Sequence, residues 1–428
     1  MIKIAILGCG TVASGVCELL GKNEAVISNR IDEQISIKKL LARSPQKALD
    51  LGFVPEQLCS SIDDIVNDDE IEIVVELIGG TTTAFDYIKT AITHGKHVVT
   101  ANKDLIAQRG CELFALADKH GVDLYFEASV GGGIPIIQPL KQSLSGNRFS
   151  QIVGILNGTT NFILTKMSSE GLSYSEALKT AQELGFAEAN PASDVMGTDA
   201  ARKITILAGI AFDTQVTLDD VYCEGITDID DSDIALAHKM GYVIKLLAVA
   251  REVEGKLLMF VRPAFVPVTH PLASVNDSFN AVFLHGDAVG DIMLYGRGAG
   301  SLPTASAVVG DIMDICRNIR HGVHGRYRST SGTDMQIAAI DELYSSFFVR
   351  LKVSDKPKVL AGVATAFGEN GVSLLSLIQN PNKDKSAELI IITHPAKEKA
   401  IRDSLSLLMQ KDYVNRIHTF MCLGLNDE

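Results

Sequence analysis

Apolar and polar residues follow two different rhythms along the first third of the chain. Short apolar runs rich in Ile and Val, around residues 1–7, 35–42, 71–78 and 95–103, predict buried strands. Stretches in which apolar residues recur at helical spacing separate these runs. Strands that alternate with helices are typical of a parallel sheet covered by helices. The pattern therefore predicts an α/β domain in the N-terminal part.

A glycine-rich turn follows the first predicted strand and leads into a helical pattern. It reads Gly8-Cys-Gly10-Thr-Val-Ala13, the dinucleotide-binding fingerprint with Ala in place of its third glycine. Gly8 permits the tight turn, Gly10 lets the backbone approach a pyrophosphate, and Ala13 allows close helix–strand packing. A glycine turn without a ligand is the alternative, and the strand–turn–helix context argues against it. The expected cofactor contacts are Gly8, Gly10, Thr11, Val12 and Ala13.

The residues after the second predicted strand indicate which nucleotide is bound. An Asp or Glu there would hold the adenosine ribose 2′-hydroxyl, but this chain has Arg43 and Ser44. Arg43 can pair with a 2′-phosphate, and Ser44 can donate a hydrogen bond to it. A solvated arginine at a strand end is the alternative. We expect NADP(H) to be preferred, with NAD(H) as the second choice.

Glycines and polar residues also follow the next two predicted strands. Gly79 comes after the third strand, and Thr100 and Lys103 come at the end of the fourth. Ligands of open α/β sheets gather at the carboxyl ends of the strands. We therefore expect Gly79, Thr100 and Lys103 to face the cofactor crevice, although a solvated strand-end lysine is the alternative for Lys103.

A run of three glycines follows the last strand of this predicted domain. The segment Val130-Gly-Gly-Gly-Ile134-Pro exposes main-chain carbonyl oxygens, which could ligate a hard cation together with the carboxylate of Glu127. The alternative is a hinge between two domains. From the residues alone we favour the hinge.

The periodicity changes beyond about residue 128. Strands are predicted at 151–156, 243–253 and 256–266, and helices at 174–184, 199–210 and 231–241. This mixture indicates an α+β domain. A glycine-rich turn over residues 294–300 and an apolar helix over 304–319 follow. That helix could pack back on the first domain.

One segment of the second domain concentrates charged residues. Asp199 and Lys203 lie one helical turn apart on one face, and Glu188 and Asp194 precede them in a Pro-containing loop. Three acids and a lysine suit a small substrate with an ammonium group and a reacting carbonyl or hydroxyl. A surface salt bridge is the alternative that the local pattern alone favours. The fingerprint, Lys103 and the glycine-rich segment together overturn that alternative.

The C-terminal part is preceded by a linker over 321–345, whose first residues, 321–333, are polar and basic. A strand at 347–354, a helix at 360–369 and a strand at 387–393 follow it. We interpret this part as a β-α-β-β-α-β module of about eighty residues.

Composition narrows the class of protein. The 428 residues suffice for two or three domains. The net charge of −13 argues against a nucleic-acid partner, and no apolar run approaches the length of a membrane span. The strand and fingerprint at the N-terminus leave no room for a signal peptide. Seven cysteines without CxxC spacing indicate free thiols, so we expect a cytoplasmic protein.

Taken together, the motifs of this chain resemble those of the monofunctional homoserine dehydrogenases that carry a C-terminal ACT domain. Four blocks carry the resemblance: Gly8-Cys-Gly-Thr-Val-Ala-Ser-Gly-Val, Gly95-Lys-His-Val-Val-Thr-Ala-Asn-Lys, Glu127-Ala-Ser-Val-Gly-Gly-Gly-Ile-Pro, and Gly185-Phe-Ala-Glu through Asp199-Ala-Ala-Arg-Lys. Asn157-Gly-Thr-Thr-Asn and Gly296-Arg-Gly-Ala-Gly strengthen it further. The resemblance implies an NAD(P)-binding Rossmann domain of residues 1–128 plus about 302–320. It further implies an α+β substrate and dimerisation domain of 129–301 and an ACT-like regulatory domain of 346–428.

The resemblance also implies a reaction and roles for single residues. The reaction is the reversible reduction of L-aspartate 4-semialdehyde to L-homoserine, a step of threonine, methionine and isoleucine biosynthesis. Lys203 matches the catalytic acid–base, and Lys103 matches a lysine beside substrate and nicotinamide. The matched substrate contacts are Gly185, Glu188 and Asp199, with Asp194 nearby, and Gly300 matches a position beside the nicotinamide. Glu127 with the carbonyls of Val130, Gly132 and Ile134 matches a sodium site, which reverses our preference for a hinge.

The resemblance also implies binding partners, and the chain differs from the family pattern at two positions. The resemblance implies a homodimer or homotetramer and threonine as an effector of the ACT-like module. The family's usual ACT turn has Gly where this chain has Lys358, so a role in assembly is the alternative for that module. Met196 also stands where the family often has Glu.

Two other functions share parts of the pattern. A Rossmann oxidoreductase acting on another amino-acid aldehyde would share the fingerprint but not the combination of Glu188, Asp199 and Lys203. A non-enzymatic amino-acid sensor would need neither Lys103 nor Lys203.

Overall fold

The computed structural model describes residues 1–325 and 334–424. The chain divides into two compact units, which we describe one at a time. Unit 1 combines Met1–Gly158, Arg202–Asp220 and Phe279–Met335, and unit 2 combines Thr159–Ala201, Val221–Ser278 and Gln336–Glu428. Part of the predicted linker over 321–345 lies outside the described residues.

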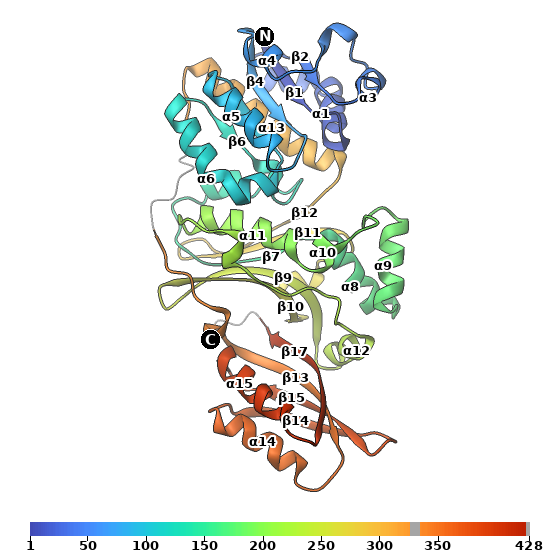
Figure 1. The fold of residues 1–428 in the computed structure, drawn as a ribbon. Coiled ribbons are helices and arrows are strands. Elements are labelled where there is room, and N and C mark those ends of the chain that lie inside the picture. Colours follow the sequence, from blue (N-terminus) through green and yellow to red (C-terminus); the bar gives the residue numbers. More distant parts are fainter. Residues whose placement is uncertain (326–333, 425–428) are drawn as a thin grey trace. The chain divides into compact units, whose positions relative to one another are not determined.

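A parallel sheet forms the N-terminal part of unit 1 (Figure 1). Its strands, in spatial order, are β3 (Leu58–Cys59), β2 (Ile35–Leu41), β1 (Ile2–Leu7), β4 (Ile71–Glu76), β5 (His97–Thr100) and β6 (Leu124–Tyr125). The chain starts at β1 and runs outward in both directions, so the strand order reverses between β1 and β4. Such a reversal opens the crevice in which Rossmann domains bind dinucleotides.

Helices cover the faces of this sheet because each presents an apolar stripe. They are α1 (Thr11–Lys22), α2 (Glu24–Ile31), α3 (Pro45–Asp50), α4 (Asp63–Val66), α5 (Thr83–Thr93) and α6 (Lys103–His120). In α1, for example, Ala13, Val16 and Leu20 are buried at helical spacing against the strands. A short α7 (Ile137–Lys141) follows the glycine-rich segment.

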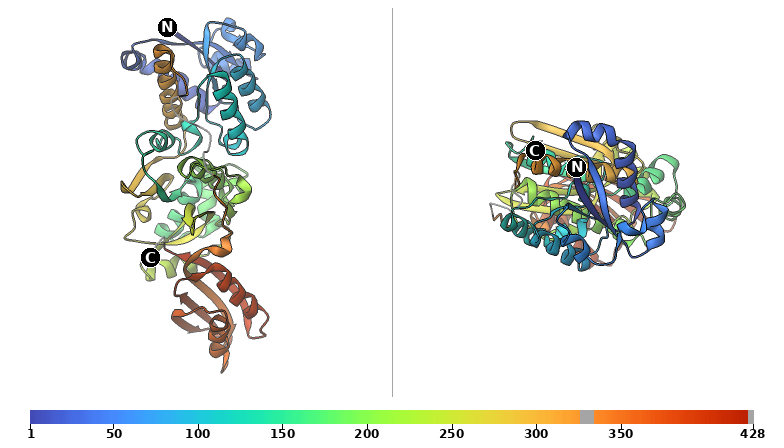
Figure 2. Two further views of the ribbon diagram at one scale, coloured as in Figure 1. Left: turned by 90° about the vertical axis from the view of Figure 1, so that its left-hand side faces the viewer. Right: turned by 90° about the horizontal axis from the view of Figure 1, so that it is seen from above.

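Helix α13 (Ser301–His321) belongs to the same core although it comes much later in the chain. Its buried face, Ala305, Val308, Val309, Ile312, Ile315 and Cys316, packs in one cluster with β1 and α1. In Figures 1 and 2 this orange helix lies among the blue N-terminal elements. It begins three residues before the predicted start, because Pro303 is tolerated in a first helical turn.

Unit 1 also contains an antiparallel group of strands. Strand β7 (Phe149–Ile155) pairs with β11 (Phe279–Gly286), which forms a hairpin with β12 (Gly290–Arg297). The predicted glycine-rich turn over 294–300 is wrong in its first half, because Leu294–Arg297 continue β12 by pairing with β11. Strand β12 was hard to predict, since its residues are mostly half-buried or exposed and lack a continuous apolar face.

Unit 2 begins with helices. They are α8 (Gly158–Glu170), α9 (Tyr174–Glu183), α10 (Ala192–Val195) and α12 (Asp231–Lys239). Helix α11 (Thr198–Ala211) starts in unit 2 and ends in unit 1. Strands β9 (Tyr242–Val253) and β10 (Lys256–Pro267) form a long antiparallel pair, and the short β8 (Tyr222–Cys223) lies parallel to β10.

The C-terminal module of unit 2 has the predicted β-α-β-β-α-β order. Its main elements are β13 (Tyr344–Ser354), α14 (Val359–Glu369), β14 (Leu374–Pro381), β15 (Ser386–Thr393), α15 (Glu398–Met409) and β17 (Val414–Leu423), with a short β16 (Ala396–Lys397). The strands lie in the order β17-β13-β15-β14, and β17 continues onto β10 through parallel pairing. The predicted three-part α/β fold class is confirmed.

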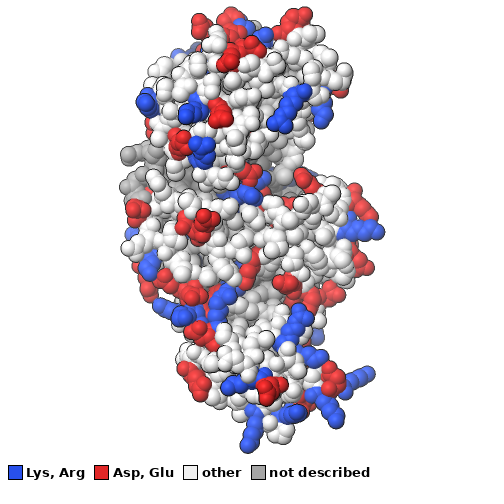
Figure 3. Space-filling view, in the orientation of Figure 1, with Lys and Arg blue, Asp and Glu red and all other residues white. Residues whose placement is uncertain are grey.

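Charged side chains are interspersed over the surface that Figure 3 shows, with acidic and basic groups adjoining one another. No helix in the described ranges is long and apolar enough to cross a membrane.

Candidate active site

The fingerprint turn leaves room for a ligand at one glycine and none at the other. Gly8 has φ of +104°, and a Cβ built on it would lie 2.8 Å from the carbonyl oxygen of Leu77 at the end of β4. Gly10 has ordinary extended backbone, is the N-cap of α1, and its Cβ would meet no atom within 4 Å. Thr11 and Val12 open the helix behind it. A phosphate can therefore approach the amides that begin α1.

A buried carboxylate organises the neighbouring strand ends. Glu76 accepts hydrogen bonds from the backbone amides of Ile78 (2.8 Å) and Gly79 (2.9 Å) and from the hydroxyl of Thr100 (2.6 Å). Asn102 then donates to the carbonyl of Gly80 (2.7 Å). These bonds end β4 earlier than predicted and fix the loops after β4 and β5. Sequence reasoning missed Glu76, although an acid at the end of an apolar strand is a usable signal.

Arg43 and Ser44 follow β2 beside the fingerprint. Arg43 is exposed, Ser44 is the N-cap of α3, and the carbonyl of Ser44 lies 4.0 Å from the thiol of Cys9. The two residues thus lie next to Cys9 of the fingerprint turn.

An ion pair in unit 1 joins the two helices that carry the candidate lysines. Asp104 on α6 and Arg202 on α11 lie 2.7 Å apart, and each is the chain neighbour of a candidate lysine. The prediction that Lys103 ends a strand is wrong, because β5 stops at Thr100 and the side chain of Asn102 caps a helix, α6, that begins with Lys103. Lys203 is 8 % exposed, and its ammonium donates to the main-chain carbonyl of Leu156 at 2.6 Å.

The predicted substrate acids lie in unit 2, on the segment that leads into α11. Asp199 is buried in the first turn of α11, one turn before Lys203 on the same helix. Asp194 lies in α10 and is half-buried, whereas Glu188 is exposed. Gly185 has φ of +75°, and the next residue, Phe186, is held by a hydrogen bond from the hydroxyl of Thr159 to its carbonyl (2.6 Å).

The glycine-rich segment forms a tightly packed turn in unit 1. Gly131 and Gly132 have positive φ, and a Cβ on Gly132 would lie 2.5 Å from the carbonyl oxygen of Gly298. Gly298 is two residues before Gly300, which is the N-cap of α13 and has φ of +121°. Only glycine fits this close approach of two backbones.

The carboxylate of Glu127 is buried and already engaged. It accepts hydrogen bonds from the amides of Ile136 (2.6 Å), Ile137 (2.9 Å) and Gln138 (2.6 Å), which open α7. Burial, the largest cause, raises the pKa of Glu127, and these hydrogen bonds oppose the rise. Within the described residues, no three His, Cys, Asp or Glu side chains gather as metal ligands. A cation here would therefore need main-chain carbonyl oxygens beside the single carboxylate of Glu127.

Family models match three consecutive parts of the chain. The model described as homoserine dehydrogenase matches residues 135–313, its NAD-binding domain matches 8–127, and an ACT domain matches 347–410. A homoserine dehydrogenase of Bacillus subtilis is 41 % identical over 418 residues, which cover 97 % of this chain and 96 % of that protein. The chain belongs to the homoserine dehydrogenase family.

Solved structures of homoserine dehydrogenases agree with this assignment. The crystal structure from Thiobacillus denitrificans superposes with a TM-score of 0.94 at 38 % identity, covering 99 % of this chain and 98 % of that one. A hyperthermophilic archaeal homoserine dehydrogenase in complex with NADPH is 27 % identical, with a TM-score of 0.63, and covers 73 % of this chain and 97 % of its own. The predicted family, the NAD(P)-dependent oxidoreductase class and the presence of an ACT domain are confirmed.

Proposed function

We propose that Lys203 is the general acid–base in the interconversion of L-aspartate 4-semialdehyde and L-homoserine. The Asp104–Arg202 ion pair carries the proposal, since it joins the helix that begins with Lys103 to the helix that holds Lys203. When bound, the nicotinamide supplies or accepts the hydride. In reduction, the ammonium of Lys203 gives a proton to the oxygen of the forming alkoxide, and in oxidation the amine takes that proton back. Lys103 polarises the same carbonyl oxygen.

The acids before α11 hold the other end of the substrate. Asp199 and Glu188 pair with the substrate ammonium, Asp194 supports them, and the backbone at Gly185 contacts the substrate. Pairing to the ammonium places the carbonyl end toward Lys203, one turn along the same helix.

We propose NADP(H) as the preferred cofactor. Arg43 and Ser44 follow β2, where Rossmann domains hold the adenosine ribose and its 2′ substituent, and a related archaeal enzyme is solved with NADPH. Gly8, Gly10, Thr11, Val12 and Ala13 would hold the pyrophosphate. Gly79, Thr100, Lys103 and Gly300 would line the nicotinamide side.

Sodium is the proposed cation of the glycine-rich turn. Glu127 and the carbonyls of Val130, Gly132 and Ile134 offer the hard oxygen donors that such an ion prefers. Its role would be to fix this turn against Gly298 rather than to take part in hydride transfer.

We also propose an effector and an oligomeric state for this enzyme. Threonine is the proposed effector of the ACT domain, and the chain is proposed to work as a cytoplasmic homodimer or homotetramer in threonine, methionine and isoleucine biosynthesis. The predicted domain bounds of 1–128 with 302–320, 129–301 and 346–428 remain part of this proposal.

The decisive assay follows nicotinamide absorbance with aspartate 4-semialdehyde in wild type and Lys203→Ala. We expect kcat to fall by about 10²- to 10⁴-fold, with the Kd for NADPH unchanged. The exposed Lys179 on α9 provides a control, and Lys179→Ala should keep full turnover. Near-normal turnover of Lys203→Ala would refute the assignment.

A further inference from the structure

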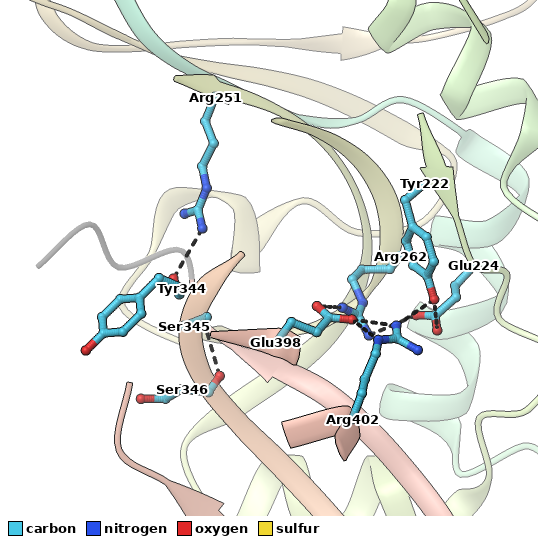
Figure 4. Close-up of polar contacts among 9 residues, drawn as sticks. All are labelled: Tyr222, Glu224, Arg251, Arg262, Tyr344, Ser345, Ser346, Glu398 and Arg402. Atoms are coloured by element: carbon cyan, nitrogen blue, oxygen red, sulfur yellow. Dashed lines mark hydrogen bonds and ion pairs between the residues drawn. The ribbon is translucent and has the colours of Figure 1, made fainter. Parts of the chain in front are cut away.

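Five side chains of unit 2 form a closed ring of polar contacts, drawn in Figure 4. The Arg262 ring consists of Arg262 on β10, Glu398 and Arg402 on α15, Tyr222 on β8 and Glu224 just after β8. The contacts run from Arg262 to Glu398 (2.7 Å), Arg402 to Glu398 (2.8 Å), Arg402 to the Tyr222 hydroxyl (2.8 Å), that hydroxyl to Glu224 (2.7 Å), and Glu224 to Arg262 (3.0 Å).

The ring joins the ACT domain to the substrate part of the chain. Glu398 and Arg402 belong to the ACT domain, whereas Arg262, Tyr222 and Glu224 belong to the preceding part. Arg262 and Glu398 are fully buried, and the two arginines balance the two glutamates in charge. A charge left unpaired at such a depth is strongly unfavourable, so each member depends on the others.

The segment next to Glu224 packs directly against the residues that open the substrate site. The amide of Ile226 donates to the carbonyl of Val195 at 2.8 Å. A Cβ on Gly225 would lie 2.2 Å from that same carbonyl oxygen. From the other side, a Cβ on Gly197 would lie 3.1 Å from the thiol of Cys223.

These contacts leave the chain from Val195 to Gly197 little freedom. Val195 ends α10 and Thr198 begins α11, so the packed residues separate Asp194 from Asp199. Gly197 also has φ of +83°, which sets the angle at which the chain enters α11. A shift of Glu224 would therefore move the 195–197 segment and, with it, both Asp194 and Asp199.

The geometry points to Glu224 as a positioning residue for the amino-acid substrate, held in place by Arg262 and, through Glu398, by the ACT domain. The inference rests on the proposed roles of Asp194 and Asp199. Glu224 acts through the 195–197 segment, and the start of α15 is thereby part of the support of the substrate site.

The test compares Glu224→Gln with Asp230→Asn. Asp230 also pairs with a buried arginine, Arg350 on β13 (2.6 Å). It caps α12, however, and among the described residues its side chain bonds to Arg350 and Asp233 and not to the 195–197 segment. Both variants turn one carboxylate into an amide beside a buried guanidinium. For Glu224→Gln we expect the KM for homoserine to rise about fivefold or more, with the KM for NADP⁺ unchanged. Asp230→Asn should leave both values unchanged.

Hydrogen exchange supplies a readout that does not depend on activity. Amides of residues 195–199 should exchange faster in Glu224→Gln than in wild type and Asp230→Asn. Gly225→Ala disturbs the same contact without changing a charge and should raise the KM for homoserine as well. Should Glu224→Gln or Gly225→Ala fail to fold, the remaining variant decides.

Two results would overturn the inference. One is an unchanged KM for homoserine together with unchanged exchange in folded Glu224→Gln. The other is an equal rise of both KM values in Glu224→Gln and Asp230→Asn, which would indicate a general loss of stability. Asp199→Asn separates this inference from the proposed substrate role. If that variant keeps its KM, the role of Asp199 fails, whereas faster exchange in Glu224→Gln would still support the mechanical link.

Discussion

Gly10 offers a way to separate ligand binding from folding. It is the N-cap of α1, its backbone conformation is open to any residue, and the space around its absent Cβ is empty to 4 Å. Gly10→Ala should therefore fold normally. Loss of glycine's freedom in the unfolded chain stabilises by about 0.4–1 kcal/mol, and the poorer N-cap offsets a similar amount. The free energy of unfolding should stay within about 1 kcal/mol of wild type.

Cofactor affinity should respond very differently. The added methyl group would occupy the path by which the pyrophosphate reaches the amides at the start of α1. Losing one hydrogen bond to a charged group costs about 1.5–3 kcal/mol, which corresponds to an increase in Kd of about 10- to 150-fold. Titration of NADPH by calorimetry, with urea unfolding on the same samples, measures both quantities.

Two other glycines serve as controls for this experiment. Gly21 lies near the end of α1 with open space around it, so Gly21→Ala should stabilise the protein by up to about 1 kcal/mol and leave NADPH affinity unchanged. Gly8→Ala should destabilise the protein, because of its positive φ and the 2.8 Å approach to Leu77. If Gly10→Ala binds NADPH as tightly as wild type, the dinucleotide does not approach this turn and the reasoning is refuted.

Three further predictions concern the 2′-phosphate, the ACT turn and a buried lysine. Arg43→Ala should weaken NADPH binding by about tenfold or more and leave NADH binding unchanged, because only NADPH carries the phosphate; equal losses in parallel titrations would count against this. Lys358 is the N-cap of α14 and has φ of +71°, the left-handed conformation that glycine adopts most easily. In steady-state assays, threonine should therefore inhibit Lys358→Gly about tenfold more strongly than Lys358→Ala. Equal inhibition of the two variants would argue against a role of this turn. Burial lowers the pKa of Lys245 to about 8, while its unfolded value stays near about 10.4. The unfolded chain therefore binds more protons between these pH values, and the stability of wild type relative to Lys245→Met should rise from pH 8 toward pH 10 in urea titrations; a flat difference would contradict this.

The elements that local pattern dictates could be predicted from the sequence. The strand, turn and helix at the fingerprint follow from apolar runs and from the glycine at residue 8, which the structure finds at φ of +104°. The β-α-β-β-α-β order of the C-terminal module followed in the same way. Helix α8 was missed because it is buried on most sides and lacks an amphipathic pattern.

Contacts between distant segments could not be predicted in the same way. Arg262 and Glu398 are 136 residues apart, and each looks in the sequence like an ordinary surface charge. Glu76 gives a similar lesson through its bond to Thr100, which ends the neighbouring strand β5 and is 24 residues away in the sequence. The roles assigned to Lys103, Lys203 and the substrate acids came from resemblance to the family, and they stay predictions until tested.

Helix α13 also sets the order in which this protein can mature on the ribosome. The ribosome synthesises β1 and α1 first, but the helix that covers their apolar faces is complete only when His321 has been added. The N-terminal segment of unit 1 ends at Gly158. At about 5–20 residues per second, the ribosome needs roughly 8–30 seconds to extend the chain from there to His321. During this interval the nascent N-terminal sheet exposes the surface that Val308, Ile312 and Ile315 later bury. Chaperone capture of stalled nascent chains should therefore decline sharply once α13 has left the exit tunnel.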